Sequence, residues 1–297
     1  MENPSLSIII LTHNEEKHLE RCIQGLHKIT KDIFIVDAFS NDKTISIAKE
    51  YNCKIYQNKW PGVHSIAINW ALDNCDITTK WVMRIDADEV LDADLIDEIR
   101  IELSQNDNPD LKGYFLKRGH IFLGKKMLHG GNFPVKILRI WRNGYAICDD
   151  KLMDEKIILS GNSKTKVLRG TFWDHNLNSI SWWIEKHNLY ATKEAIMQLK
   201  NKYSKTELNH HDDNRTILKY LFYERFPKSI RAFLYFIYRY FFKLGFLDGY
   251  QGLAWNFLQG FWYRFLVDVK VYEIEKIAEN NKITVNEVIK SEYGIDV

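Results

Sequence analysis

The sequence predicts an α/β protein with a mostly parallel sheet, an antiparallel extension and a helical C-terminal region. Three observations support this class. The first hundred of the 297 residues alternate short apolar runs with segments of helical periodicity. Strands that are each followed by a helix are typical of a parallel sheet covered by helices. From residue 111 the pattern changes to short β-like runs, and residues 217–272 hold 20 of the 40 aromatic residues.

The elements of the first part follow from apolar spacing. The expected strands are 6–11, 33–36, 53–56 and 81–85, and the expected helices are 15–28, 42–51, 65–74 and 92–103. Asp42 is the N-cap candidate of the second helix, because its carboxylate accepts from first-turn N–H groups. Ligands of such sheets bind at the carboxyl ends of the strands, so this edge is the expected site.

The later part predicts short strands and then helices. The expected strands are 114–122, 135–141, 145–148, 155–159 and 165–168, followed by a long helix over 180–199 and a polar linker over 200–215. We therefore predict a catalytic domain over 1–178, with a nucleotide-binding half (1–110) and an acceptor half (111–178), and a helical region over 179–297.

Composition excludes several classes of protein. A net charge of +2 does not fit a protein that coats nucleic acid. The four cysteines form no C-x-x-C pair, so neither a zinc site nor a dithiol site is indicated. Residues 1–7 carry no basic stretch ahead of the apolar run, which predicts a cytoplasmic chain with reduced thiols.

Residues 217–272 predict contact with a membrane surface. They combine the aromatic residues with 8 Lys and Arg against 3 Asp and Glu. Their longest uncharged run has 15 residues, and crossing a bilayer takes roughly 20. Amphipathic helices lying on a membrane have this composition, and packing on each other or in a homo-oligomer is the alternative. The residues expected at the interface are Arg231, Arg239, Lys243, Arg264, Lys270, Trp255, Trp262 and Tyr263.

Polar residues follow three of the expected strands. Asp86-Ala87-Asp88 comes directly after the fourth strand, and two carboxylates at this spacing can share a divalent cation that bridges a diphosphate. Asp37 ends the second strand, where a carboxylate can accept from a base N–H. Residues 12–15 add Thr12, Asn14 and Glu15. Neither glycine-rich phosphate loop, G-x-x-x-x-G-K-[ST] or G-x-G-x-x-G, occurs.

These segments together resemble the family-2 glycosyltransferases, whose catalytic domain has the Rossmann-like GT-A fold. The resemblance runs through residues 6–16, 36–44 and 84–89. His129-Gly130-Gly131, Met153-Asp154-Glu155 and residues 245–249 are similar to the bacterial branch that builds lipopolysaccharide core, O-antigen and capsule chains.

The resemblance implies an inverting, hexosyltransferase-type reaction from a nucleotide-diphosphate sugar, usually UDP-linked, to a hydroxyl of a glycan or lipid-linked glycan. It implies that Asp37 and residues 12–15 hold the nucleoside and that Asp86 and Asp88 hold the diphosphate. Asp88 would be the direct ligand of Mg²⁺ or Mn²⁺, with His175 as a candidate in the metal shell. The enzyme would work peripherally on the inner face of the cytoplasmic membrane.

An inverting reaction needs a carboxylate that takes the proton of the acceptor hydroxyl. Related sequences often have His-Glu where this chain has Asp154-Glu155, which favours Glu155 as the base and leaves Asp154 second. Asp149 and Asp150 are further candidates. His129, Gly130 and Gly131 are candidates for contact with the donor sugar or the acceptor, because glycine lets a backbone approach a ligand closely.

Two other functions remain open at this point. A sugar-phosphate nucleotidyltransferase would need a glycine-rich basic loop after the first strand, and residues 12–16 do not provide one. A non-catalytic nucleotide- or carbohydrate-binding scaffold would not need the carboxylates Asp86, Asp88 and Glu155.

Overall fold

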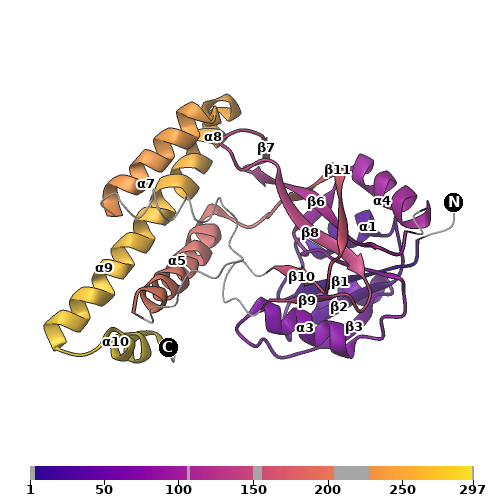
Figure 1. The fold of residues 1–297 in the computed structure, drawn as a ribbon, viewed down its shortest axis with the longest axis horizontal. Coiled ribbons are helices and arrows are strands. Elements are labelled where there is room, and N and C mark those ends of the chain that lie inside the picture. Colours follow the sequence, from indigo (N-terminus) through magenta and orange to yellow (C-terminus); the bar gives the residue numbers. More distant parts are fainter. Residues whose placement is uncertain (1–3, 106–107, 150–155, 204–227, 296–297) are drawn as a thin grey trace. The chain divides into compact units, whose positions relative to one another are not determined.

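The computed structural model describes residues 4–105, 108–149, 156–203 and 228–295 (Figure 1). The chain divides into two compact units. Unit 1 contains Met1–Leu128 and Asn132–Asn178, and unit 2 contains His129–Gly131 and Ser179–Val297. The short segment His129–Gly131 therefore packs with the helices of unit 2, although the sequence places it within the acceptor half.

Unit 1 is built on a nine-stranded sheet among the described residues, in the order β3-β2-β1-β4-β8-β6-β11-β5, with β7 paired to β6. Strands β1, β2, β3 and β4 pair in parallel, and β4–β8 and β6–β8 are antiparallel. The strands are β1 (Leu6–Thr12), β2 (Ile33–Asp37), β3 (Lys54–Gln57), β4 (Trp81–Arg84), β5 (Glu89–Leu91), β6 (Leu111–Phe122), β7 (Lys125–Met127), β8 (Val135–Arg142) and β11 (Lys164–Asp174). The expected mixed sheet with an antiparallel extension is confirmed.

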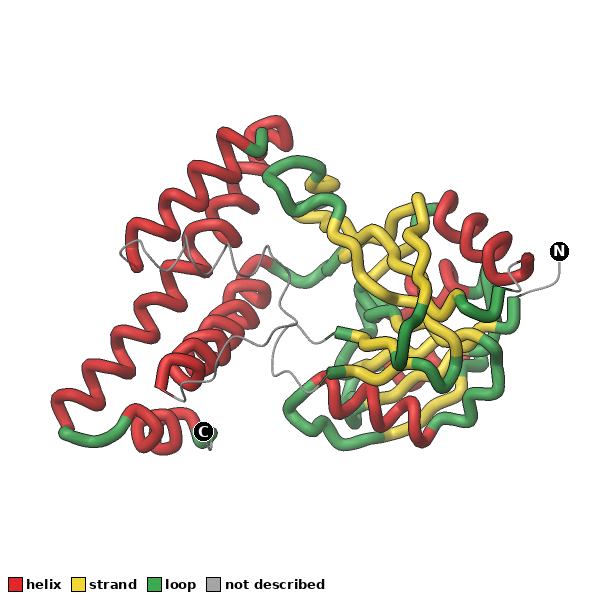
Figure 2. Tube along the Cα trace, viewed as in Figure 1, coloured by secondary structure: helices red, strands yellow, loops and turns green. Residues whose placement is uncertain are grey.

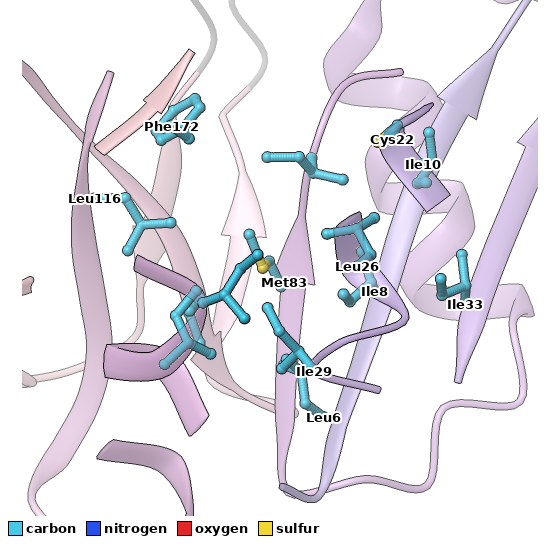
Figure 3. Close-up of a cluster of buried hydrophobic side chains, with 14 of the residues drawn as sticks. Leu6, Ile8, Ile10, Cys22, Leu26, Ile29, Ile33, Met83, Leu116 and Phe172 are labelled. Atoms are coloured by element: carbon cyan, nitrogen blue, oxygen red, sulfur yellow. The ribbon is translucent and has the colours of Figure 1, made fainter. Parts of the chain in front are cut away.

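Helices cover both faces of the parallel strands, which explains why four consecutive residues of β1, 8–11, are apolar. Leu6, Ile8 and Ile10 face one side and pack with residues of α1 (Leu19–Leu26) and α4 (Ala93–Gln105), as Figure 3 shows in part. Ile9 faces the other side with Ala71 of α3 (His64–Asn74). Helix α2 (Thr44–Glu50) begins two residues after Asp42, so Lys43 and not Asp42 occupies the N-cap position, although Asp42 Oδ1 accepts from the Thr44 N–H at 2.9 Å.

Three details of the sheet differ from the sequence prediction. Strands β5 and β7 have three residues each, which is too short for a periodic signal. Strand β11 extends to Asp174 and pairs in parallel with β6, so the extension is not purely antiparallel. Strands β9 (Ala146–Cys148) and β10 (Ile157–Leu159) form a separate two-stranded sheet.

Unit 2 is helical (Figure 2). Helix α5 (Ile180–Tyr203) packs on α9 (Tyr263–Asn281), and α10 (Val285–Tyr293) completes this core, which includes Ala195, Val271 and Val288. The remaining segments are α7 (Lys228–Ile237), a π-helix (Tyr238–Phe242), a 3₁₀ turn (Gly245–Asp248), α8 (Gly249–Trp255) and a second π-helix (Asn256–Trp262). None of the described helices combines the length and apolar composition needed to cross a bilayer.

Three residues expected at a membrane interface are instead buried within unit 2. Arg231 forms an ion pair with Asp268 of α9, and both side chains are at most 5% exposed. Arg239 is 3% exposed and donates from Nε to the carbonyl oxygen of Gly130 at 2.9 Å. Trp255 is 6% exposed. The prediction was wrong for these three because helix spacing does not show which side of an aromatic helix faces inward.

Candidate functional site

The expected polar residues of the first two strands meet at the carboxyl edge of the parallel sheet. Thr12 and Asp37 are paired at the ends of β1 and β2. Asp86 follows β4, whose Arg84 is paired with Ile9 of β1. The topology therefore brings the nucleoside candidates and the carboxylate pair to one edge of unit 1, as parallel strands require.

Hydrogen bonds lock the loop after β1 to the loop after β2. The Asn14 N–H donates to Ser40 Oγ at 2.8 Å, and Asn14 Oδ1 accepts from the Asn41 N–H at 2.9 Å. The Glu15 N–H donates to Thr44 Oγ1 at 2.7 Å. Asn14 has a φ of +57°, which asparagine tolerates better than most residues. These bonds fix both loops in advance of any ligand.

Asp37 has a structural role in this arrangement. Its side chain is fully buried, and it accepts from Thr12 Oγ1 at 2.9 Å and from the N–H and Oγ of Ser40 at 2.8 and 2.5 Å. The carboxylate thus ties β1 to the loop after β2. Its binding of a base stays a prediction, because the carboxylate is fully buried and already accepts three hydrogen bonds.

A cavity of about 210 Å³ lies against these loops. Thr12 and Glu15 line it from the β1 side, and Asn58, Trp60 and His64 line it from the segment that leads into α3. Pockets for drug-sized ligands are roughly 300–1,000 Å³, so this cavity suits one part of a nucleotide, such as the base.

Trp60 and His64 were not among the residues predicted from the sequence. The Trp60 side chain is 43% exposed, and its ring meets that of His64 edge-on with centroids 4.7 Å apart. The usable signal was the position of Trp60-Pro61-Gly62, which comes shortly after the third parallel strand and therefore at the same edge of the sheet.

Asp86 is surrounded by positive charge. Its carboxylate lies 3.3 Å from Arg84 Nη2 and 3.2 Å from Arg139 Nη2. Although burial would raise it, the charges of Arg84, Arg139 and His64 hold the pKa of Asp86 well below its usual range. Asp86 is therefore ionised at every physiological pH.

Glu89 is the buried partner of the same arginine. Arg139 Nη2 lies 2.5 Å from Glu89 Oε1, and both side chains are at most 5% exposed. Glu89 Oε2 accepts from the Asp86 N–H at 2.8 Å, which holds the turn between β4 and β5. Burial, and then the carboxylates of Asp86 and Asp88, raise the pKa of Glu89 against the effect of Arg139. Arg139 is thus a positioned cation of the site rather than a solvated arginine at a strand edge.

The structure places Asp88 next to His175. The His175 N–H donates to the carbonyl oxygen of Asp88 at 2.9 Å, where the end of β11 meets β5. Asp88 Oδ2 accepts from Asn176 Nδ2 at 2.9 Å. Arg21 contacts His175 twice, with Nη1 2.9 Å from Nδ1 and Nη2 2.7 Å from the carbonyl oxygen. Burial and the nearby Arg21 and His18 lower the pKa of His175, which keeps its ring neutral at pH 7.

The residues at this edge fit a divalent cation that is completed by a substrate. Within the described part of the chain, no three His, Cys, Asp or Glu side chains are clustered as a ready-made metal cage. Mg²⁺ in nucleotide enzymes is commonly held by one or two carboxylates together with phosphate oxygens. Asp88 supplies one carboxylate for such a site, while Asp86 is held by its two arginines and the His175 ring is contacted by Arg21 at Nδ1.

The candidates His129, Gly130 and Gly131 lie in unit 2. The His129 ring, at Nδ1, lies 2.7 Å from Oδ1 of the buried Asp248, whose Oδ2 accepts from the His129 N–H at 2.9 Å. Gly130 has a φ of +80°, and a Cβ there would lie 2.6 Å from Asn256 Oδ1. Close packing against these helices is therefore one reason for glycine at position 130.

The candidate bases Asp150, Asp154 and Glu155 lie outside the described residues. Their described neighbour Asp149 closes the β9–β10 hairpin, since its N–H donates to the carbonyl oxygen of Lys156 at 2.9 Å and its Oδ1 accepts from the Lys156 N–H at 2.6 Å. The Asp149 carboxylate thereby already accepts a backbone N–H.

Comparison with known proteins decides the family. The sequence model described as "Glycosyl transferase family 2" matches residues 7–158, which contain the whole carboxyl-edge site except His175. The chain belongs to this family. The match also covers the Asp150–Glu155 segment.

Curated relatives agree with this assignment. The chain is 26% identical over 199 residues to an uncharacterized glycosyltransferase, RT0209, of Rickettsia typhi, and the alignment covers 64% of this chain and 66% of that protein. The aligned part thus spans just under two thirds of that relative. It is 27% identical over 202 residues to the lipopolysaccharide core biosynthesis glycosyltransferase LpsC of Rhizobium meliloti, covering 66% of this chain and 72% of LpsC.

Solved structures with a similar chain trace are more distant in sequence. A crystal structure of TarS from S. aureus has 15% identity and a TM-score of 0.41, covering 93% of this chain and 91% of that one. The mannosyltransferase PcManGT of Pyrobaculum calidifontis, in complex with GDP-Man and Mn²⁺, has 13% identity and a TM-score of 0.44, covering 92% and 88%.

Proposed function

We propose that this glycosyltransferase moves a sugar, with inversion, from a nucleotide-diphosphate donor, expected to be a UDP-sugar, to a hydroxyl of a lipid-linked, lipopolysaccharide or capsule glycan. The observation that carries the proposal is the carboxyl-edge site, where the cavity beside Thr12 and His64 adjoins the charged group around Asp86. The name of the relative LpsC supports the class of acceptor.

The nucleoside end of the donor would occupy the cavity. Thr12, Glu15 and Trp60 line it, and Asn14 holds the two loops together beside it. Base stacking on an aromatic ring contributes about 1–3 kcal/mol per base, and Trp60 is the exposed aromatic ring of this lining. Asp37 keeps the loops in place from beneath.

The diphosphate would lie toward Asp86 and Asp88. Asp88, with His175 beside it, would hold a Mn²⁺ or Mg²⁺ ion, which when bound neutralises the charge that develops on the leaving diphosphate. Arg139 adds a fixed positive charge at the same edge, and its contacts with Asp86 and Glu89 determine where that charge lies. Preorganised charge of this kind is a major source of catalysis.

The acceptor hydroxyl needs a base on its side of the sugar. Glu155 is proposed for this role, with Asp154 second and Asp150 next. A carboxylate there takes the hydroxyl proton as the oxygen attacks the anomeric carbon and the diphosphate leaves. The lipid-linked acceptor places the reaction at the inner face of the cytoplasmic membrane, where the protein would be peripheral, or bound through residues 217–272 to a second copy.

The experiment measures UDP affinity with and without Mn²⁺, and UDP release from a panel of UDP-sugars. Asp88→Asn should lower UDP affinity about 10- to 100-fold in Mn²⁺, as expected for one charge-assisted contact, and leave it nearly unchanged with chelator. Asp110→Asn is the matched control, because Asp110 is an exposed carboxylate of the same unit, paired with Lys164. Trp60→Ala should weaken UDP binding equally in both conditions.

Turnover separates the base from donor binding. Glu155→Gln should keep UDP affinity and lower transfer about 10²- to 10⁴-fold. A larger loss in Asp154→Asn would exchange the two roles. Equal UDP affinity of the wild-type protein with and without Mn²⁺ would contradict the metal assignment. Pyrophosphate release from UTP and a sugar phosphate would support a nucleotidyltransferase, and UDP binding without turnover of any donor would support a scaffold.

A further inference from the structure

The helical hairpin of unit 2 ends in an exposed apolar tip, which we define as residues 241–250. The tip joins the first π-helix to α8 through the 3₁₀ turn. Phe242 and Tyr250 are 74% and 75% exposed. Four more large apolar side chains of the tip are between 43% and 53% exposed: Phe241, Leu244, Phe246 and Leu247.

These side chains surround the tip instead of lining one face. Phe241 and Phe242 are consecutive, as are Phe246 and Leu247, and consecutive residues of a helical turn point in clearly different directions. A helix that docks on one protein surface exposes apolar residues three and four positions apart. Along α7 the exposed residues Ile230, Phe233 and Leu234 have that one-sided spacing, whereas the consecutive exposed pairs of the tip fit a medium that encloses it.

The same hairpin buries polar groups while it exposes apolar ones. Asp248 is 3% exposed and bonded to His129, Arg239 is 3% exposed, and Asn256 is fully buried. The carbonyl oxygen of Lys243 accepts from the Gly130 N–H at 2.9 Å. The tip is thus an ordered turn held from inside by polar contacts. Its outward apolar residues are not a frayed end.

The charge of the tip points to the kind of surface it meets. Of its two charged residues, Lys243 is exposed and Asp248 is buried. No carboxylate therefore faces outward from residues 241–250, and the single outward charge is positive. Phosphate headgroups over an acyl layer complement that combination, since lysine can reach the headgroups while aromatic and aliphatic side chains enter the interface.

We propose that the tip inserts into the interfacial layer of a lipid bilayer, with Lys243 at the level of the phosphates, and that apolar burial provides most of the attachment. This inference rests on the proposed membrane acceptor. Attachment through apolar side chains differs from the attachment expected from composition, in which basic residues are attracted to anionic headgroups. Arg231 and Arg239, two of the arginines in that expectation, are buried in unit 2 and do not reach headgroups.

Vesicle flotation of the full chain tests the tip. The wild-type protein should float with neutral phosphatidylcholine vesicles, and high salt should leave most of that binding in place. Phe242→Ser with Tyr250→Ser should lower partition by about tenfold or more for each side chain, the loss expected for removing one large apolar group from the membrane. The control is Leu189→Ser with Tyr272→Ser, because these α5 and α9 residues are 64% and 58% exposed and lie outside the tip.

A second measurement does not depend on loss of binding. Phe242→Trp should show a blue-shifted emission component with vesicles that brominated lipids quench, and Leu189→Trp should not. The proposal is overturned if wild-type protein binds only anionic vesicles at low salt, or if the tip and control pairs float equally. It is also overturned if neither the wild-type protein nor Phe242→Ser with Tyr250→Ser binds vesicles, and if these two substitutions dissociate a lipid-free dimer. A second copy of the chain would then cover the tip.

UDP release tests the proposed function independently of vesicle binding. UDP release from a soluble donor should be unchanged in Phe242→Ser with Tyr250→Ser. If the wild-type protein floats and releases no UDP, the catalytic proposal fails and the tip assignment stands. If it releases UDP and does not float, the tip assignment fails alone.

Discussion

Replacing Arg231 by methionine should destabilise unit 2 strongly. Arg231 of α7 and Asp268 of α9 form a two-pronged ion pair, with Nε 3.1 Å from Oδ2 and a second contact from Nη2 to Oδ1. The side chains are 4% and 5% exposed. Arg231→Met keeps most of the apolar stem and removes the charge, so Asp268 is left as a buried carboxylate without its arginine.

The size of the effect follows from that burial. Removing one partner of a buried ion pair typically costs about 3–5 kcal/mol, whereas exposed pairs contribute about 0–1 kcal/mol. Replacing both partners by apolar residues of similar volume is often neutral. We therefore expect Arg231→Met to lose about 3–5 kcal/mol and Arg231→Met with Asp268→Leu to recover most of that loss.

Urea unfolding followed by helical circular dichroism measures the loss. The free energy of unfolding falls by about 1–3 kcal/mol per molar urea. The urea midpoint of the unit 2 transition should therefore fall by roughly 1 M or more in Arg231→Met. The two units can unfold separately, so each transition is fitted by itself. Lys270→Met is the control, because Lys270 is a half-buried cation of α9, the helix that carries Asp268.

A small effect would refute this reasoning. If Arg231→Met costs less than about 1 kcal/mol, the range of an exposed pair, Arg231 is not buried against Asp268. The guanidinium would then be available to lipid headgroups, as composition alone suggested, and salt-dependent attachment would regain its basis. The double variant tests the charge itself, because Asp268→Leu removes the buried carboxylate that Arg231→Met leaves behind.

Two further predictions concern single positions. Gly130→Ala should destabilise unit 2 by about 1–3 kcal/mol more than Gly124→Ala destabilises unit 1. Both glycines have positive φ. A Cβ at 130 would lie 2.6 Å from Asn256 Oδ1, whereas a Cβ at 124 would meet nothing within 4 Å. Urea midpoints of the two variants check this, and equal losses would mean that backbone conformation alone selects glycine at 130. Burial raises the pKa of Cys53 to about 11 and that of Cys75, with a smaller contribution from Asp76, to about 12, so a thiolate-specific reagent should label both slowly in folded protein at pH 8 and quickly in urea. Rapid labelling before unfolding would contradict the burial of these thiols.

The sequence alone determined the parallel half of the sheet. Strands β1, β2 and β4 are buried on both faces and appear as mostly apolar runs, and the helices between them show apolar residues every three to four positions. The polar residues after β1, β2 and β4 were sufficient to locate the carboxyl edge, because parallel strands all end on the same side. Thr12, Asp37 and Asp86 are found at that edge.

Tertiary structure decided how those residues are used. Asp37 is engaged by Thr12 and Ser40, and Arg139 lies between Asp86 and Glu89, about fifty positions away along the chain. Such partners are set by the pairing of β4 with β8, and no local pattern specifies it. The same holds for Trp60, which reaches the site from the loop beyond β3.

Unit 2 shows most clearly what the sequence alone does not determine. Helix α7 is amphipathic at a period of 3.6 residues, yet Arg231 on its polar side is buried, whereas its apolar residues Ile230, Phe233 and Leu234 are exposed. Arg231 faces inward because Asp268, 37 residues later, meets it, and Asp248 faces inward because His129, 119 residues earlier, meets it. Buried polar groups need partners, and those partners come from distant parts of the chain. Composition therefore determined that this region is aromatic and basic, while long-range pairing of its charges decided which side chains remain outside.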